Sequence, residues 1–161
     1  LSQIERSSAM SDSRPGLVSA VVYRDPKAAI TFLENAFGFE LTLLIEDAEG
    51  NLAHSQMEYA GHRIMIGNEW SENHASPASL AGKNTQSAHI YIAADVDGHC
   101  ERAKAAGAEI LAPPQTQFYG ARTYRCRDPE GHIWTVSADV EVVSTDEMEK
   151  RSGLKIAVGA G

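Results

Sequence analysis

The stretch SAHIY at residues 87–91 repeats the pattern of the stretch SAVVY at residues 19–23. Each begins with a Ser-Ala pair, continues with mainly apolar residues and ends in Tyr. Short runs of β-branched and aromatic residues are typical of β-strands. The two stretches lie 68 positions apart in a chain of 161 residues, so the sequence predicts two copies of one structural unit.

A helix follows each of these strands. In the first copy, Asp25 is a suitable N-cap, Pro26 takes the first helical position and Gly38 is a suitable C-terminal stop. In the second copy, the helix begins at Val96 and ends at Gly107. Three further strands complete each βαβββ unit. The expected strands are 17–23, 40–46, 52–59 and 62–69 in the first unit, and 86–94, 109–112, 123–127 and 132–138 in the second.

The two units should form one domain, 16–140, because a unit of about 60 residues buries too little surface to be comfortably stable alone. The segment STDEMEKR at 144–151 has a capping Ser, an acidic first turn and a basic last turn, which predicts a short helix. The expected divisions are a poorly ordered leader (1–15), module one (16–70), a polar connector (71–85), module two (86–140) and a tail (141–161).

Charge and composition narrow the choice of partners. The chain has 14 Lys and Arg against 22 Asp and Glu, a net charge of −8, which disfavours nucleic acids and anionic membranes. Its apolar stretches are shorter than the roughly 18 residues that span a bilayer. Cys100 and Cys126 lack CxxC spacing and are expected to be buried, free thiols. We therefore expect a soluble, cytoplasmic protein.

Two motifs late in module two resemble a known family. They are Tyr-Gly-x-Arg at 119–122 and Asp-Pro-Glu-Gly-His-Ile-Trp at 128–134, and Ala-Phe-Gly-Phe at 36–39 is similar too. Over about residues 16–139 the chain resembles the vicinal oxygen chelate superfamily, which contains glyoxalase I, bleomycin-resistance proteins and extradiol dioxygenases. The resemblance implies an α+β fold, in which two paired βαβββ modules form a curved mixed-sheet cup with the helices outside. It also implies a homodimer that binds a small molecule.

The resemblance implies four metal-ligand positions, one on the first and one on the last strand of each module. In this sequence they fall on Val18, Met65, His89 and Thr135. Only His89 is a usual ligand, whereas a divalent metal centre needs about three such groups. We therefore expect no metal cofactor. The alternative is a displaced divalent-metal site built from His54, Glu58 and His89, since His54 and Glu58 share one face of an expected strand.

Several residues are candidates for ligand binding. His89 and Tyr91 share a strand face, and Ile90 between them is expected to face the core. Arg122, with Tyr124 on the same strand face, is a candidate for an anionic group. Arg125 and Arg127 either bind an anion as well or pair with Asp128, Glu130 or Glu109. Trp134 is expected to anchor the core. The remaining candidates are Trp70 and Phe118, which are expected at the rim, and His54.

The sequence therefore predicts a small-molecule-binding protein whose usual metal site is lost or altered. Its ligand should be mid-sized and partly aromatic or apolar. We identify no catalytic residue, because no nucleophile motif or phosphate-binding loop is present. The alternative is a metal-dependent lyase resembling lactoylglutathione lyase, an isomerase or a dioxygenase. Such an enzyme would use the displaced ligand set to stabilise an enolate-like charge.

Overall fold

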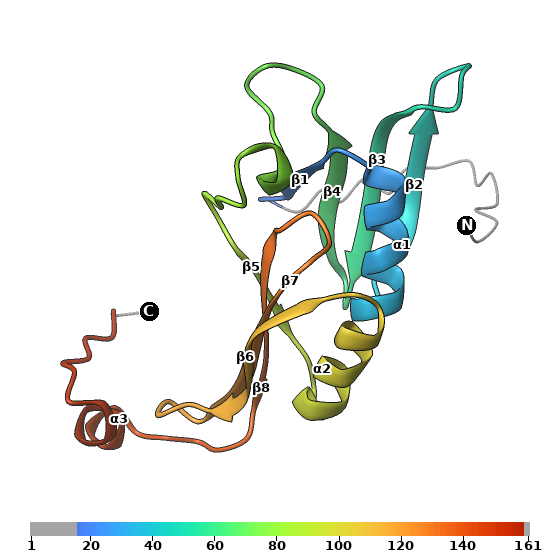
Figure 1. Ribbon diagram of the computed structural model, residues 1–161. Coiled ribbons are helices and arrows are strands. Elements are labelled where there is room, and N and C mark those ends of the chain that lie inside the picture. Colours follow the sequence, from blue (N-terminus) through green and yellow to red (C-terminus); the bar gives the residue numbers. More distant parts are fainter. Residues whose placement is uncertain (1–15, 160–161) are drawn as a thin grey trace.

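The computed structural model describes residues 16–159, and the expected leader, 1–15, lies outside the described residues (Figure 1). The elements follow the predicted order in both halves. They are β1 (Ser19–Tyr23), α1 (Pro26–Phe37), β2 (Glu40–Glu46), β3 (Leu52–Tyr59), β4 (His62–Asn68), the 3-10 helix η1 (Pro77–Ser79), β5 (Ala88–Tyr91), α2 (Val96–Ala105), β6 (Glu109–Thr116), β7 (Ala121–Arg127), β8 (Ile133–Asp139) and α3 (Thr145–Ser152).

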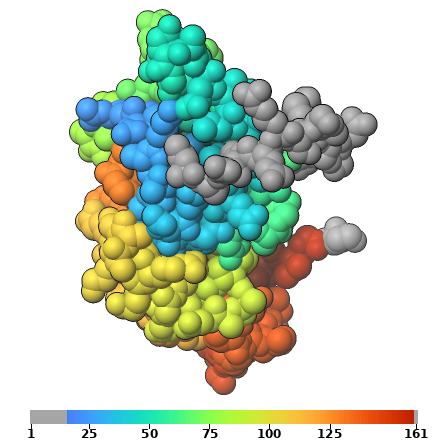
Figure 2. Space-filling view, turned by 90° about the vertical axis from the view of Figure 1, so that its right-hand side faces the viewer, coloured from blue at the N-terminus to red at the C-terminus, as the bar shows by residue number. Residues whose placement is uncertain are grey.

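Each module forms a four-stranded mixed sheet, with strand order β1-β4-β3-β2 in module one and β5-β8-β7-β6 in module two. The first strand runs parallel to the last in both modules, and the other neighbours are antiparallel. Helices α1 and α2 pack against each other. In the space-filling view the blue surface of α1 adjoins the yellow-green surface of module two (Figure 2). The predicted α+β fold of paired βαβββ modules is confirmed.

Local chemistry explains where α1 begins and ends. The Asp25 side chain accepts a hydrogen bond from the backbone N–H of Ala28 at 3.0 Å, and Pro26 starts the helix. Gly38 ends it in the left-handed conformation, with φ of +78°. Helix α2 begins in the same way, because Asp95 caps the N–H of Gly98. Both caps supply acceptors for the N–H groups that a helix leaves free in its first turn.

The strands differ from the predicted ranges mainly in module two. Strand β5 is limited to Ala88–Tyr91, whereas β6 continues to Thr116 through Pro113 and Pro114. Proline is tolerated there because β6 is an edge strand and its pairing with β7 is irregular along this stretch.

The two modules correspond with a shift of 69 residues in their first strands, one more than the repeated sequence suggests. Val21 and Ile90 are the buried residues in the middle of β1 and β5. Ala20 pairs with Met65, just as His89 pairs with Thr135. Ala20, and not Val18, is therefore the module-one counterpart of His89.

The turn at 128–131 joins the two modules. Its Asp128 accepts a hydrogen bond from the hydroxyl of Tyr23 at 2.7 Å. Its Glu130 accepts hydrogen bonds from both backbone N–H groups of residues 24–25, each at 2.7 Å. The motif that resembles the family signature thus fixes the end of β1 to the start of β8.

The tail contains the predicted short helix, α3, which is capped by Ser144. None of its residues is buried, and it contacts none of the other helices or strands of residues 16–159 (Figure 1). The segment 140–143, which we call the tail root, attaches the tail to the domain. The backbone N–H groups of Val140 and Glu141 donate hydrogen bonds to the carbonyl of Gly120. Within residues 16–159, no helix combines the length and the apolar character that crossing a bilayer requires.

Candidate functional site

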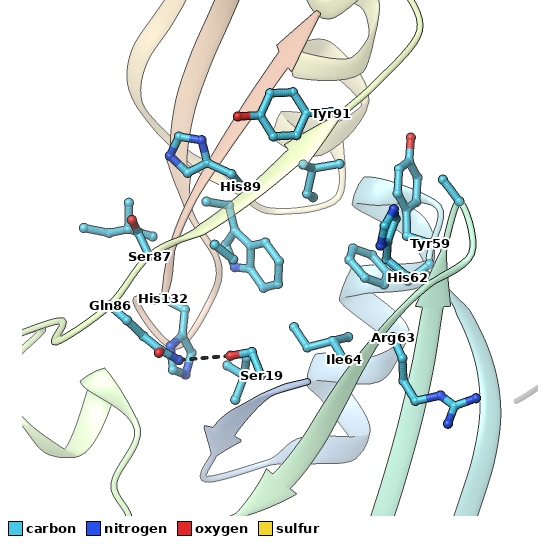
Figure 3. Close-up of a pocket in the computed structure, with 17 residues that line it drawn as sticks. Ser19, Tyr59, His62, Arg63, Ile64, Gln86, Ser87, His89, Tyr91 and His132 are labelled. Atoms are coloured by element: carbon cyan, nitrogen blue, oxygen red, sulfur yellow. Dashed lines mark hydrogen bonds between the residues drawn. The ribbon is translucent and has the colours of Figure 1, made fainter. Parts of the chain in front are cut away.

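A cavity of about 490 Å³ lies between the two modules, beside the edge strands β1 and β5 (Figure 3). We call it the intermodule cavity. Pockets of this size accept drug-sized molecules. It is lined by Ser19, Val21, Phe39, Tyr59, Ala60, His62, Arg63, Ile64, Gln86, Ser87, Ala88, His89, Ile90, Tyr91, His132, Ile133 and Trp134.

The floor of the intermodule cavity is apolar and buried. Val21, Ile64 and Ile90 come from the core-facing positions of β1, β4 and β5. Trp134 is 1% exposed, which confirms its predicted role as a core anchor, and its ring packs against Phe39 with the centroids 6.0 Å apart. Such a floor favours an aromatic or aliphatic group, because burying apolar surface is the main source of its binding energy.

The rim of the cavity is polar and aromatic. His89 and Tyr91 stand on β5, with their ring centroids 6.4 Å apart, and Tyr59 and His62 flank the β3–β4 turn opposite them (Figure 3). At the other end, the Gln86 side chain donates to the hydroxyl of Ser19 at 3.3 Å. The rim therefore offers several hydrogen-bonding groups around an apolar floor.

The structure places His89 and Tyr91 as the strand alternation predicted. Both line the intermodule cavity, and Ile90 between them is buried in the core. The contribution of module one was not predicted, because Tyr59 and His62 come from a hairpin turn far away in the sequence. Only the fold brings that turn opposite β5.

Arg122 and Tyr124 lie on the side of β7 that faces α2, not at the cavity. Arg122 forms a two-pronged ion pair with Asp97, with distances of 2.6 and 2.7 Å. The Tyr124 hydroxyl lies 2.8 Å from Nδ1 of His99 and is buried. The two residues share a face, as predicted, but that face is turned away from the ligand site.

Trp70, Phe118 and His54 do not line the intermodule cavity either. Trp70 is 69% exposed and stacks on His74, with centroids 4.1 Å apart. Phe118 packs edge-to-face on its neighbour Tyr119. His54 contacts Gln56 on the same strand, with Nε2 of each 3.2 Å apart.

The alternative metal site is not assembled. His54, Glu58 and His89 do not form a common cluster, and within residues 16–159 no group of three His, Cys, Asp or Glu side chains is arranged to hold a metal ion. Glu58 is instead paired with Arg63, Oε1 to Nη2, at 2.9 Å. At the positions that the resemblance implies for metal ligands, with Ala20 replacing Val18 by the strand register, Ala20, Met65 and Thr135 accompany His89. This donor set does not suit a divalent metal.

Cys100 and Cys126 are both free and buried, as predicted. Burial raises the pKa of the Cys126 thiol to about 12 and also raises the pKa of Cys100. Thiols with raised pKa values are poor nucleophiles because little thiolate forms at neutral pH. Neither cysteine therefore contributes reactive chemistry.

A set of six polar side chains stands in register on the face of module two that bears His89. His89 and Arg125 both pair with Thr135 across the sheet. Tyr91 and Thr123 both pair with Ser137 in the next row. We call these six residues the polar grid: His89, Thr135, Arg125, Tyr91, Ser137 and Thr123.

The hydroxyl residues of the polar grid were not among the residues predicted from the sequence. Their signal was the alternation in β8, where Thr135 and Ser137 interleave with the apolar Trp134, Val136 and Ala138. Such alternation shows that two residues share a face. It does not show which side chains of the neighbouring strands stand beside them, since that depends on the register.

Comparison with known proteins gives consistent results. A family model described as the Glyoxalase/Bleomycin resistance protein/Dioxygenase superfamily matches residues 17–136. TioX from Micromonospora sp. ML1 has a similar structure, with a TM-score of 0.62 and 32% identity, covering 79% of this chain and 100% of TioX. The fosfomycin resistance protein FosX from Listeria monocytogenes shares the fold, with a TM-score of 0.59 and 22% identity, covering 84% of this chain and 99% of FosX. An uncharacterized protein of Mycobacterium bovis is 28% identical over 139 residues, which are 84% of this chain and 90% of that protein.

Proposed function

Because this chain belongs to the Glyoxalase/Bleomycin resistance protein/Dioxygenase superfamily, we propose that it binds one mid-sized, partly aromatic or apolar small molecule in the intermodule cavity. The observation that carries the proposal is the cavity itself, with its apolar floor and its rim of His and Tyr side chains. Sequestration of a toxic compound is one physiological form of such binding. FosX is by name a fosfomycin resistance protein, and at 22% identity it supports this idea only as a protein of the same fold.

The proposed binding is independent of a metal ion. Of the four positions that would supply ligands, only His89 has a suitable side chain. Glu58, the one carboxylate of the alternative set, forms an ion pair with Arg63. The chemistry that remains is hydrogen bonding from the rim and apolar burial in the floor. These are properties of a binding protein rather than of a Lewis-acid catalyst.

The proposal includes a homodimer and a cytoplasmic location. The first strands β1 and β5 are both edge strands, whose outer backbone groups can pair with another chain, apart from the Val22 carbonyl, which lies 2.7 Å from Nε2 of His132. Two free thiols support a reducing compartment, because disulfides are rare there. Sedimentation velocity tests the dimer, and a monomer at micromolar concentration contradicts it.

The test uses N-phenyl-2-naphthylamine, a neutral aromatic probe that fluoresces more strongly in apolar surroundings. We expect saturable binding of one probe per chain. Ala88 lines the cavity, so the larger side chain of Ala88→Phe should occupy it and abolish probe binding. Ala112→Phe, at an exposed site on β6, is the matched control and should bind normally.

Two additions make this test decisive. If Ala88→Phe does not fold, Ser87→Trp at the exposed rim serves in its place. The same titration is repeated with Mn²⁺, Zn²⁺, Ni²⁺ or Mg²⁺ present, and neither affinity nor melting temperature should rise. Failure of the wild-type protein to bind the probe contradicts the proposed site, and a metal that the protein holds tightly contradicts metal independence.

A further inference from the structure

Within residues 16–159, Arg125 has no acidic partner, unlike the other two arginines of β7. Arg122 is paired with Asp97, and Arg127 lies 3.5 Å from Glu109. Among the described residues, Arg125 makes one hydrogen bond, from Nε to the Thr135 hydroxyl at 3.4 Å. Its two terminal guanidinium nitrogens are left free, and the side chain is exposed. The chain has a net charge of −8, so a positive charge without a carboxylate partner among the described residues is unusual in it.

Hydroxyl groups surround this charge on the polar grid. Thr123, Thr135 and Ser137 are only 5–9% exposed, which is low for residues on an open sheet face. Thr123 accepts a hydrogen bond from Gln117 at 3.0 Å. Ser137 is paired with Tyr91 on one side and Thr123 on the other, so its hydroxyl stands within this face, where it can donate to a ligand oxygen.

A second arginine on the same face is also incompletely satisfied. Arg127 is two residues from Arg125 and therefore points to the same side of β7. Its Nε is buried and has no acceptor among residues 16–159. Arg127 has Glu109 as its partner at 3.5 Å, and Asp139, further along β8, lies on the same face. No carboxylate of residues 16–159 is paired with Arg125, so the unpaired positive charge of this face is at Arg125, which favours an anion there.

We propose that Arg125 binds an anionic group of the ligand, namely a carboxylate, phosphate, phosphonate or sulfonate, and that the hydroxyls of Ser137 and Thr135 assist it. Guanidinium groups bind such oxyanions through two parallel hydrogen bonds. The inference rests on the proposed function and specifies its ligand class. The ligand is an amphiphile with an aromatic or apolar part in the intermodule cavity and an anionic group beyond it.

The strand register of module two sets the distance between the apolar part and the anionic group of the ligand. His89 belongs to both the cavity and the polar grid, and Arg125 stands two strands away from it, across β8. Neighbouring strands lie about 4.8 Å apart, so the backbones at His89 and Arg125 are about 10 Å apart. Arg125 does not line the cavity, and Ile90 and Trp134 in the cavity floor are on the opposite face of the sheet from His89 and Arg125. A ligand that reaches both must therefore be elongated and pass over the free edge of β5 at His89.

The test compares two probes that differ only in charge. N-phenyl-2-naphthylamine is neutral, and 6-anilinonaphthalene-2-sulfonate carries a sulfonate at the far end of the same ring system. In the wild-type protein the sulfonate should bind more tightly. Arg125→Gln should weaken sulfonate binding about ten- to hundredfold, the range expected for a lost charge-assisted hydrogen bond, and leave the neutral probe within about twofold.

Arg122→Gln is the matched control, because Arg122 is on the same strand but faces α2. It should leave the binding of both probes unchanged. Arg125→Lys keeps the positive charge but cannot form the two parallel hydrogen bonds of a guanidinium. Its sulfonate affinity should therefore lie between those of Arg125→Gln and the wild-type protein. Raising the salt concentration should weaken sulfonate binding in the wild-type protein and in Arg122→Gln, but have little effect in Arg125→Gln.

Each outcome has one meaning. If the neutral probe binds and Arg125→Gln does not lower sulfonate affinity, the role of Arg125 is overturned while the proposed function stands. If the neutral probe does not bind at all, the proposed function fails and the inference fails with it. If Arg125→Gln instead changes the sedimentation coefficient and not sulfonate affinity, the arginine pairs with a carboxylate of a second copy, which also overturns the inference.

Discussion

The hydroxyl of Tyr23 donates a 2.7 Å hydrogen bond to Oδ2 of Asp128, 105 positions further along the chain. Oδ2 of Asp128 also accepts the indole N–H of Trp134 at 3.1 Å, and Oδ1 accepts two backbone N–H groups of its own turn. Burial and the Asp128 charge raise the pKa of Tyr23 well above its ordinary value, so the hydroxyl remains a donor at neutral pH. This carboxylate therefore holds the two modules together.

Tyr23→Phe should lower the free energy of unfolding by about 1–3 kcal/mol, because it removes a donor from a buried carboxylate and leaves the ring in place. Urea denaturation at pH 7 measures the change. Tyr119→Phe removes a hydroxyl that is partly exposed and should have no measurable effect. Equal stabilities for Tyr23→Phe and Tyr119→Phe would show that the bond does not stabilise the fold.

The role of the turn at 128–131 was only half predictable from the sequence. Asp-Pro-Glu-Gly has the residues that a tight turn requires, and the turn forms where it was predicted. The partner of Asp128 was not predictable, because a local motif carries no information about a side chain in the other module. The repeated pattern predicted two modules, and the Asp128 contacts show how they are joined.

Strand alternation predicted faces correctly but did not identify which face bears the ligand site. His89 and Tyr91 reach the cavity, whereas Arg122 and Tyr124 reach α2. The hydroxyl is the one polar group of the Tyr124 side chain, and it contacts His99 inside the protein. Tyr124 is therefore buried, although its sequence position suggested that it could contact a ligand. Charge and polarity therefore could not distinguish a binding face from a helix-facing one.

Gly120→Ala should destabilise the protein far more than Gly50→Ala. Both glycines have positive φ, +91° and +82°, so both substitutions carry the cost of about 1 kcal/mol for the left-handed conformation. At Gly120, however, a Cβ atom would lie 2.2 Å from the carbonyl oxygen of Glu141, whereas at Gly50 it meets nothing. We expect a loss above about 2 kcal/mol at Gly120 in thermal unfolding. Similar losses of stability for Gly120→Ala and Gly50→Ala would show that the backbone at Glu141 can shift away from the added Cβ atom.

Removing the tail beyond residue 143 should change stability by less than about 0.5 kcal/mol, because α3 buries nothing against the domain. A chain ending at Asp139, the last residue of β8, also loses the bonds from Val140 and Glu141 to Gly120 and should be clearly less stable. Thermal unfolding of the two truncated chains, at a concentration where each is monomeric, tests this difference. A large loss on the shorter deletion would mean that α3 contacts the domain in solution.

His99 should make the protein less stable as the pH falls. The residue is 8% exposed, and burial, followed by the charge of Arg102, lowers its pKa from 6.5 to about 4. Between these two values the unfolded chain binds a proton that the folded chain does not bind. The contribution of His99 is therefore fully present above pH 6.5 and is lost as the pH falls towards 4, by about 3 kcal/mol at most.

His99→Phe tests this because the new ring keeps the stacking on Phe37 but cannot be protonated. The variant should be less stable than the wild-type protein at pH 7, since it leaves the Tyr124 hydroxyl without its partner. The deficit relative to the wild-type protein should shrink between pH 6.5 and pH 4.5 in urea denaturation. His62→Gln, which removes an exposed imidazole, should follow the wild-type pH dependence. A constant difference between His99→Phe and the wild-type protein at all pH values would mean that His99 is protonated equally in the folded and unfolded chains.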